Sequence, residues 1–220
     1  MKTALVIGTT GLVGRRLVEQ LLNDLAFEKV VVFARRSGGF QSTKLQEHII
    51  DFDHPELWQH LVKGDVLFSA LGTTLAKAGS KQAQYKVDYT FQYQFASAAA
   101  HNSVPVYVLV SSAGANPQSN FFYMRMKGEL ERDIKGLVFW SINIIKPGPL
   151  HGKRVESRPT EIIGLSIIRF FNGMGLFRKY RPISGEEVSR AMINVAKSVK
   201  PGFNEYGLDN LFKLAQISDQ

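Results

Sequence analysis

Short apolar runs alternate with stretches of helical periodicity over the first two thirds of the chain. Residues 3–7, 30–33 and 66–71 are largely apolar, which predicts strands. Between the first two runs, leucine and valine recur at helical spacing over residues 12–25, as they do on the buried side of a helix. The same criteria predict further strands over residues 48–51, 104–110 and 138–145, and further helices over residues 80–101 and 120–134.

The alternation of strands with helices is typical of βαβ units and a parallel sheet. We therefore predict an α/β fold, a doubly wound parallel sheet of the Rossmann type, in a single domain over residues 1–220. Residues 150–220 are less regular, and we expect them to form a small substrate-side or lid portion. Within them, Ser184-Gly185-Glu186-Glu187 is a capping box that predicts a helix to about residue 199. The helix over residues 80–101 carries an aromatic stripe that suits either a core or a dimer surface.

A glycine-rich turn joins the first predicted strand to the first predicted helix. It consists of Gly8-Thr9-Thr10-Gly11-Leu12-Val13-Gly14, with glycine at every third position. In this context one glycine permits the tight turn, one lets the backbone approach a pyrophosphate, and one lets helix and strand pack closely. The free N–H groups at the start of the helix then face the phosphates. The turn therefore predicts a dinucleotide site.

The end of the second strand indicates which dinucleotide binds. An NAD site usually carries a carboxylate about 20 residues after the glycines, where it holds the ribose 2′-hydroxyl. Here Arg35 and Arg36 occupy that place. Because two guanidinium groups suit a 2′-phosphate, the predicted cofactor is NADP(H). The alternative is that one of these arginines forms a surface ion pair.

Two further strand ends supply candidate cofactor contacts. Asp51 and Phe52 follow the third strand and are placed to flank an adenine. Leu71, Gly72 and Thr73 follow the fourth strand, at the carboxyl edge where ligands of open sheets bind. Ordinary loop structure is the alternative for both segments.

Tyr123 and Lys127 are candidates for acid–base chemistry. They lie four residues apart on the helix predicted over residues 120–134, and so on one face of it. An ammonium beside a phenol lowers the pKa of tyrosine from its usual value near 10, which lets the phenol exchange a proton with a carbonyl oxygen. Ser111 and Ser112 end the fifth strand, and either hydroxyl can bind that oxygen. We favour Ser112, which is nearer the end of the strand.

Taken together, these motifs and Pro147-Gly148 after the sixth strand resemble the atypical short-chain dehydrogenase/reductase superfamily. The narrower resemblance, over about residues 3–200, is to the Tat-interacting oxidoreductase-like family. It rests on Leu71-Gly72-Thr73-Thr74 with Lys77-Ala78-Gly79, Ser119-Asn120-Phe121 with Tyr123 and Lys127-Gly128-Glu129, and Glu156-Ser157-Arg158-Pro159.

The resemblance implies NADPH in an extended cleft, with Pro147-Gly148 near the nicotinamide. Tyr123 would be the general acid and base, and Lys127 would lower its pKa while binding the nicotinamide ribose. The chain departs from the pattern at Val87-Asp88, where short-chain dehydrogenases often carry an asparagine of a proton relay. We therefore expect an NADP(H)-dependent oxidoreductase acting on an unidentified carbonyl or alcohol. The alternative is an NADPH-binding regulatory or protein-interaction module with little turnover.

Composition and charge narrow the partners. The net charge is +8 at pH 7, but the basic residues are scattered, which suits a phosphorylated cofactor and a solvated surface rather than nucleic acid. There is no cysteine, and the histidines lack ligand spacing, so no metal site is predicted. The apolar stretch over residues 162–177 is too interrupted for a membrane span. It suits a buried or lid helix, with peripheral membrane contact as the alternative, and we expect a cytoplasmic protein.

Overall fold

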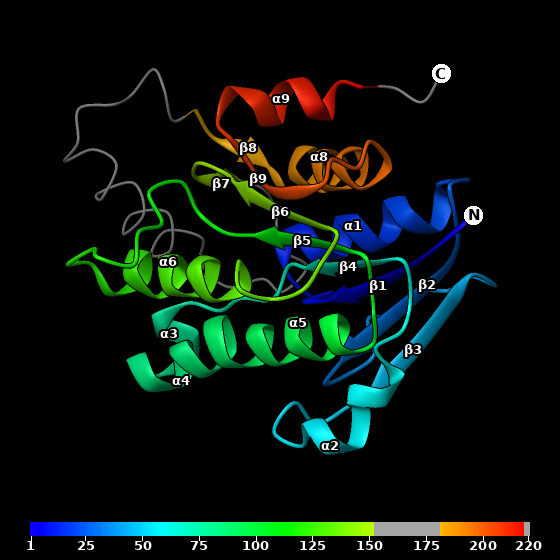
Figure 1. Ribbon diagram of the computed structural model, residues 1–220, viewed down its shortest axis with the longest axis horizontal. Helices are drawn as coiled ribbons and strands as arrows, with labels where there is room; N and C mark the ends of the chain where they lie inside the picture. Colours follow the sequence, from blue (N-terminus) through cyan, green and yellow to red (C-terminus); the bar gives the residue numbers. More distant parts are fainter. Residues whose placement is uncertain (152–180, 218–220) are drawn as a thin grey trace.

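The computed structural model describes residues 1–151 and 181–217 of the chain. A seven-stranded sheet lies at its centre, in the order β3-β2-β1-β4-β5-β6-β9, and every neighbouring pair in it is parallel (Figure 1). The chain moves outward from β1 to one edge, returns to the middle, and continues from β4 to the other edge, which is a doubly wound topology. The predicted α/β fold class is confirmed. The strands of the sheet are β1 (Lys2–Ile7), β2 (Phe27–Ala34), β3 (Leu45–Ile49), β4 (Val66–Ser69), β5 (Val106–Val110), β6 (Ser141–Lys146) and β9 (Gly202–Gly207), and β7 (Leu150–His151) pairs with β8 (Ile183–Ser184) in a second sheet.

Helices cover both faces of the central sheet (Figure 1). α1 and α8 pack on one face, and α5 and α6 pack on the other. Because alternate residues of a strand point to opposite faces, Ala4 and Val6 of β1 join the first core, while Leu5 and Ile7 join the second. All four are completely buried, as the apolar run predicts for a central parallel strand. The helices are α1 (Leu12–Asn23), α2 (Pro55–Trp58), α3 (Leu75–Ala78), α4 (Lys81–Tyr85), α5 (Phe91–His101), α6 (Phe122–Ile134), α8 (Gly185–Lys197) and α9 (Asp209–Ala215), with a 3-10 turn at Gln59–Leu61.

The helix predicted over residues 80–101 contains a π-helical turn. α4 continues directly into this turn, Lys86–Thr90, and the turn continues into α5. At its end the Phe91 N–H donates to the Lys86 carbonyl, five residues back instead of four. Within the turn, the Asp88 carbonyl accepts a hydrogen bond of 2.7 Å from the Gln92 side chain. The turn places the Asp88 side chain against α6.

The aromatic residues of this helix divide between two environments. Phe95 is completely buried in the core between the sheet and α5. Tyr85 and Tyr89 are partly buried and stack on each other, with 4.7 Å between their ring centroids. Their hydroxyls donate to Glu129 and Asp133 of α6 at 3.1 and 2.5 Å. The aromatic stripe therefore belongs partly to the core and partly to the contact with α6.

Some elements differ from the predicted ones. The third strand occupies Leu45–Ile49 instead of residues 48–51, which leaves Asp51 in the loop beyond it. The sixth strand begins at Ser141, because the residues before it form the turn after α6, where Val138 is 86% exposed. The sequence does not predict β9, an edge strand whose apolar residues are too few and only partly buried. The helix predicted over residues 162–177 lies outside the described residues.

The N-terminus of α8 has the predicted capping box. The Ser184 hydroxyl accepts a hydrogen bond from the Glu187 N–H at 3.1 Å, and the Glu187 carboxylate accepts one from the Ser184 N–H at 2.9 Å. The bond from the Ser184 N–H stabilises the carboxylate and lowers the pKa of Glu187. Two N–H groups that a helix start leaves without partners are thus satisfied reciprocally.

Replacing Ser184 with alanine should lower the free energy of unfolding by about 1 kcal/mol, since a backbone donor loses its acceptor. Because the pKa of Glu187 is lowered in the folded state, its stabilising contribution is complete above the ordinary glutamate pKa of about 4.3 and is lost as the pH falls through the lowered value. Urea unfolding of Ser184→Ala and Glu187→Gln at neutral and acidic pH measures both effects. The control Ser97→Ala, within α5, should change stability by no more than about 0.5 kcal/mol. An equal loss in the control would contradict the role of the cap.

Candidate active site

The glycines of the first turn fill three different structural roles. Gly8 has a φ of +88°, and a Cβ there would lie 2.3 Å from the Ala70 backbone at the end of β4. A Cβ at Gly14 would lie 2.1 Å from the Gly8 carbonyl oxygen, so α1 packs directly on the turn. Gly11, the N-cap of α1, has more room, since the nearest atom to its Cβ position lies 3.2 Å away. Gly8 and Gly14 are therefore required by packing, whereas a Cβ at Gly11 would be less tightly crowded.

The start of α1 is suited to an anion. In the described part of the chain, no side chain caps its N-terminus, and its first turn contains no acidic residue. Thr9 is 1% exposed, and its hydroxyl has no hydrogen-bond partner among the described residues. Free N–H groups, the positive end of the helix dipole and a buried hydroxyl fit a pyrophosphate. Thr10 is exposed beside them, while Leu12 is partly and Val13 fully buried.

Arg35 and Arg36 lie directly after β2, and both are exposed. A third guanidinium approaches the same loop from α1. Arg15 donates to the Gly38 carbonyl at 3.2 Å and lies 5.1 Å from the centroid of the Phe40 ring. The sequence contains Arg15 as part of an arginine pair, but nothing in its spacing links it to a loop that follows the next strand.

Asp51 and Phe52 lie in different environments. The Phe52 ring is 3% exposed and packs 5.2 Å from the Phe91 ring and 5.4 Å from the Phe95 ring. It is a core residue, because an aromatic ring gains more from burial among other rings than from exposure in a loop. Its side chain is therefore not available to flank an adenine. Asp51 is exposed, and its carboxylate accepts a hydrogen bond from the Asp53 N–H at 3.0 Å.

The loop after β4 is held by Asp88. The Thr73 N–H donates to its carboxylate at 2.8 Å, and a Cβ at Gly72 would lie 3.2 Å from the other carboxylate oxygen. Leu71 and Val87 are partly buried and pack against the core between the sheet and α5. The end of β4 and the π-helical turn thus form one unit beside the glycine-rich turn.

Tyr123 and Lys127 lie together on α6, as their spacing predicts. The Lys127 ammonium is 6.0 Å from the centroid of the Tyr123 ring, and the Ser112 side chain is close enough to the phenol to lower its pKa, while the Ser112 hydroxyl donates to the Ala113 carbonyl at 3.3 Å. Burial raises the pKa of Tyr123 and outweighs the lowering by the Lys127 charge that the spacing predicts, and the Asp88 charge raises the pKa further, so that the net shift is upward. The spacing of the two residues predicts the effect of Lys127 on the pKa of Tyr123, but it does not predict the effects of burial and of the Asp88 carboxylate.

Asp88 and Lys127 form a buried ion pair. Their closest atoms are 3.0 Å apart, and their side chains are 2% and 4% exposed. Burial alone would lower the pKa of Lys127, but Asp88, together with Tyr123 and Glu131, outweighs this effect and raises it. Lys127 is therefore charged at neutral pH, and its charge is shared between Tyr123 and Asp88.

The two serines after β5 have different partners. The Ser111 hydroxyl donates to the buried Glu131 carboxylate, which pairs with Lys146 at 2.9 Å. The Ser112 hydroxyl donates to the Ala113 carbonyl at 3.3 Å, and its side chain lies near Tyr123. Ser111 therefore belongs to a network of hydrogen bonds and ion pairs with Glu131 and Lys146, whereas Ser112 lies near Tyr123.

The loops after β5 and β6 are joined, since the Ala113 N–H donates to the Pro147 carbonyl at 2.9 Å. Pro147 is buried and Gly148 partly so. Because all strands of the sheet are parallel, these loops share the carboxyl edge with the glycine-rich turn, the loop after β4 and Ser112. The predicted residues are thus brought to one edge, with Phe52 and Ser111 turned into the interior.

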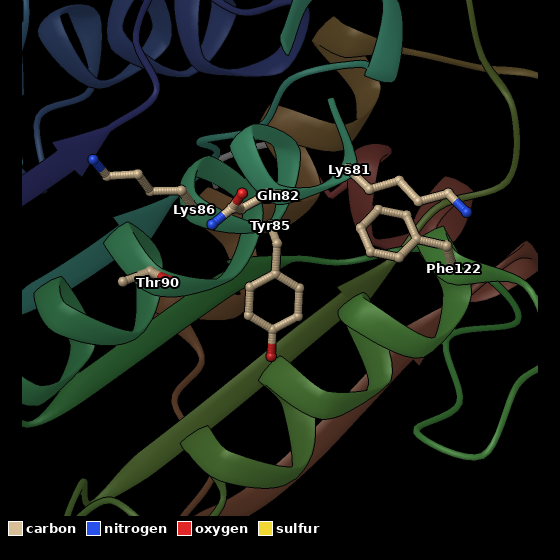
Figure 2. Close-up of a pocket in the computed structure, with 6 residues that line it drawn as sticks. All are labelled: Lys81, Gln82, Tyr85, Lys86, Thr90 and Phe122. Atoms are coloured by element: carbon tan, nitrogen blue, oxygen red, sulfur yellow. The ribbon is translucent and has the colours of Figure 1, made fainter. Parts of the chain in front are cut away.

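A separate hollow lies between α4, the π-helical turn and the start of α6 (Figure 2). Its volume is about 520 Å³, and Tyr85 points into it while Lys81 extends over the ring of Phe122. None of the predicted site residues lines it. Its lining is Lys81, Gln82, Tyr85, Lys86, Thr90 and Phe122.

The HIM1 family model matches residues 40–171, which is more than half of the chain. The chain belongs to the HIM1 family. Among curated proteins it is similar to the mitochondrial protein FMP52 of Saccharomyces cerevisiae, with 38% identity over 205 residues that cover 87% of this chain and 86% of the relative. It is also similar to the mitochondrial protein FMP52 of Candida albicans, with 36% identity over 221 residues and 96% of each chain covered.

Solved structures resemble this HIM1-family protein in fold. One is a short-chain dehydrogenase/reductase superfamily protein from Agrobacterium tumefaciens with bound NAD, at a TM-score of 0.69 and 13% identity, covering 94% of this chain and 77% of that one. Another is the UDP-glucose 4-epimerase of Thermotoga maritima with UDP-glucose, at a TM-score of 0.69 and 13% identity, covering 97% and 81%. The Bordetella bronchiseptica enzyme WbmH in complex with NAD⁺ matches at a TM-score of 0.69 and 17% identity, covering 94% and 75%. At these identities the likeness concerns the fold, which is that of short-chain dehydrogenases/reductases.

These comparisons correct two expectations. The family they name is HIM1, with FMP52 proteins as relatives, and not the Tat-interacting oxidoreductase-like family. The cytoplasmic location is wrong, because the relatives are labelled mitochondrial. A chain without cysteine suits any reducing compartment, so this feature of the composition does not distinguish a mitochondrial from a cytoplasmic location. Among the helices that the structure describes, none combines the length and apolarity needed to cross a membrane.

Gly14→Ala should lower the free energy of unfolding by roughly 1–3 kcal/mol, because its Cβ would meet the Gly8 carbonyl oxygen at 2.1 Å. Gly136→Ala is the matched control, since its Cβ would have an ordinary contact at 3.4 Å. The control should be neutral or slightly stabilising. Urea unfolding measures both variants, and a Gly14→Ala protein as stable as the control would refute the close packing of α1 on the turn.

Proposed function

We propose that this HIM1-family protein is an NADP(H)-dependent oxidoreductase of the short-chain dehydrogenase/reductase type that interconverts a carbonyl compound and an alcohol. The observation that carries the proposal is the cluster of Ser112, Tyr123 and Lys127 at the same sheet edge as the glycine-rich turn. A hydroxyl, a phenol and an ammonium close to one another are the groups needed to move a proton to or from a carbonyl oxygen.

Residues of the first half would hold the cofactor. The turn over residues 8–14 would bind the pyrophosphate, and the unpartnered Thr9 hydroxyl in the described structure supports this fit. Arg35 and Arg36 would bind the 2′-phosphate, which favours NADP(H) over NAD(H). A bound nicotinamide supplies or accepts the hydride, and the residues of the chain handle the proton.

The proton step uses the residues on β5 and α6. The Ser112 hydroxyl donates to the carbonyl oxygen of the substrate and holds it beside Tyr123. The Tyr123 phenol gives its proton to that oxygen as negative charge develops there, and the charge of Lys127 stabilises the phenolate that remains. In the opposite direction the phenolate takes the proton from the alcohol.

One observation favours a second function. Because Asp88 shares the charge of Lys127 and the net pKa shift of Tyr123 is upward, the tyrosine is less activated than its spacing predicts. Such a site suits a protein that binds NADPH as a regulatory or protein-interaction module with little turnover. Nucleotide binding and turnover must therefore be measured separately.

Calorimetry should give tighter binding of NADPH than of NADH. Arg35→Ala combined with Arg36→Ala should weaken NADPH binding by at least about tenfold, because hydrogen bonds to a charged group each contribute roughly 1.5–3 kcal/mol. NADH binding should remain nearly unchanged. Arg190→Ala, on the exposed side of α8, is the control and should alter neither affinity. Equal weakening of both nucleotides would refute recognition of the 2′-phosphate.

Tyr123→Phe should keep NADPH affinity and slow carbonyl reduction by roughly 10²–10⁴-fold, the usual contribution of a general acid. The measurement is NADPH oxidation with a panel of aldehydes and ketones. Tyr93→Phe, on α5, serves as the matched control and should react at the wild-type rate. A Tyr123→Phe protein that reduces the best substrate at full rate would exclude the mechanism. Tight binding of NADPH without oxidation by any member of the panel would favour the second function.

A further inference from the structure

Asp88 is a buried carboxylate beside the candidate site that has no part in the proposed proton step. It is 1% exposed and lies in the π-helical turn Lys86–Thr90, a local feature that is frequent at functional sites. One carboxylate oxygen pairs with Lys127 at 3.0 Å, and the other accepts the Thr73 N–H at 2.8 Å. The Gln92 side chain holds its backbone carbonyl and also binds Ser69 at the end of β4. Both the side chain and the backbone of Asp88 are therefore held in place.

The carboxylate changes the charge that surrounds Tyr123. The charged groups that act on the phenol are Lys127 on α6 and Asp88 on the π-helical turn, and the Ser112 side chain approaches the phenol from the loop after β5. Glu131, one turn further along α6, acts on Lys127. A neutral amide at position 88 would keep a hydrogen-bond acceptor for Thr73 but remove the carboxylate that pairs with Lys127. With aspartate, the pair is neutral as a whole, and nothing in it strongly favours a phenolate.

We propose that Asp88 is a positioning residue that, by neutralising Lys127, keeps Tyr123 as a protonated phenol at neutral pH, the form from which the site starts in the reducing direction. The proposal rests on the proposed function, since a direction has meaning only where a carbonyl and an alcohol are interconverted. In this proposal Asp88 affects the reaction through Lys127 and Tyr123 and does not contact the substrate.

The reaction in this direction balances with the groups named. The carbonyl carbon gains a hydride from the reduced nicotinamide, which is thereby oxidised, and the C–O π bond breaks. The carbonyl oxygen gains the proton of Tyr123, and water then returns a proton to the phenolate. A site that starts with a phenol is ready for this reaction at neutral pH, whereas alcohol oxidation must wait for the phenol to ionise.

The test is a titration of the Tyr123 phenol in the protein without nucleotide. Tyrosine labelled with ¹³C at Cζ reports ionisation, and the Tyr123 signal is identified by its absence in Tyr123→Phe. In Asp88→Asn the midpoint should move to lower pH by about one unit, the size typical of a single charge a few ångströms away. An unchanged or higher midpoint in Asp88→Asn overturns the proposal.

Asp53→Asn is the matched control. Asp53 also pairs with a lysine, Lys86, at 2.5 Å, but on the exposed outer side of the same turn. Its replacement should leave the Tyr123 midpoint where it is in the wild type. A shift as large as that of Asp88→Asn would overturn the proposal, because the effect would then not depend on the buried pair.

A second set of variants decides the question if Asp88→Asn does not fold. Lys127→Met alone leaves the carboxylate unopposed and should raise the Tyr123 midpoint. Adding Asp88→Asn to Lys127→Met removes both charges, and the midpoint should return close to that of the wild type. A double variant whose midpoint stays as high as that of Lys127→Met overturns the proposal.

The pH dependence of turnover is a further test, because a purely structural role of Asp88 would not shift it. In Asp88→Asn, the pH at which alcohol oxidation reaches half its maximum should fall by the same amount as the phenol midpoint, while Asp53→Asn keeps the wild-type profile. Calorimetry with NADPH tests the proposed function separately from the role of Asp88. If no nucleotide binds, the proposed function fails, and the phenol titration still decides whether Asp88 controls Tyr123.

Discussion

The buried ion pair between Lys127 and Asp88 is the interaction on which the rest of the candidate site depends. Two charges almost completely removed from water are tolerated only when each finds its partners. Removing one member of such a pair typically costs roughly 3–5 kcal/mol, a large part of the about 5–15 kcal/mol that stabilises a domain. Because Asp88 also binds Thr73, this one carboxylate ties the π-helical turn, the loop after β4 and α6 into a single arrangement.

A second buried charge holds α6 from another direction. Glu131 lies one turn after Lys127 and pairs with Lys146 of β6, and Lys146 pairs with Glu205 of β9 at 2.8 Å. Burial raises the pKa of Glu131, while its hydrogen bonds with Ser111 and Lys146 oppose that shift. Neighbouring turns of one helix thus carry opposite charges with partners on different elements. The helix that carries Tyr123 cannot rotate or slide without leaving one of these charges unpaired, which keeps the phenol in a defined place.

The parts of the fold that the sequence predicts are those set by local interactions. The capping box at Ser184 depends on neighbours in the chain, while the turn around Gly8 and the apolar run of β1 leave a clear local pattern, and each is present as expected. The π-helical turn and β9 depend on contacts from elsewhere. The turn is stabilised by contacts of Asp88 with α6 and the loop after β4, and β9 by pairing along β6, so neither leaves a periodic pattern of its own.

The same distinction between local and distant contacts explains which features of the candidate site the sequence predicts. Helical geometry fixes the separation of Tyr123 and Lys127, so a four-residue spacing is enough to predict that they meet. It is not enough to predict the sign of the pKa shift, because Asp88 reaches Lys127 from a different helix and burial depends on the whole fold. Ser111 and Phe52 lie at strand ends, where a ligand contact is expected, but distant parts of the chain decide their contacts. The Ser111 hydroxyl donates to the Glu131 carboxylate on α6, and the Phe52 ring packs among other aromatic rings in the core. A spacing motif therefore identifies which groups can react, whereas the charge balance that sets their direction has to be read from the partners that the fold supplies.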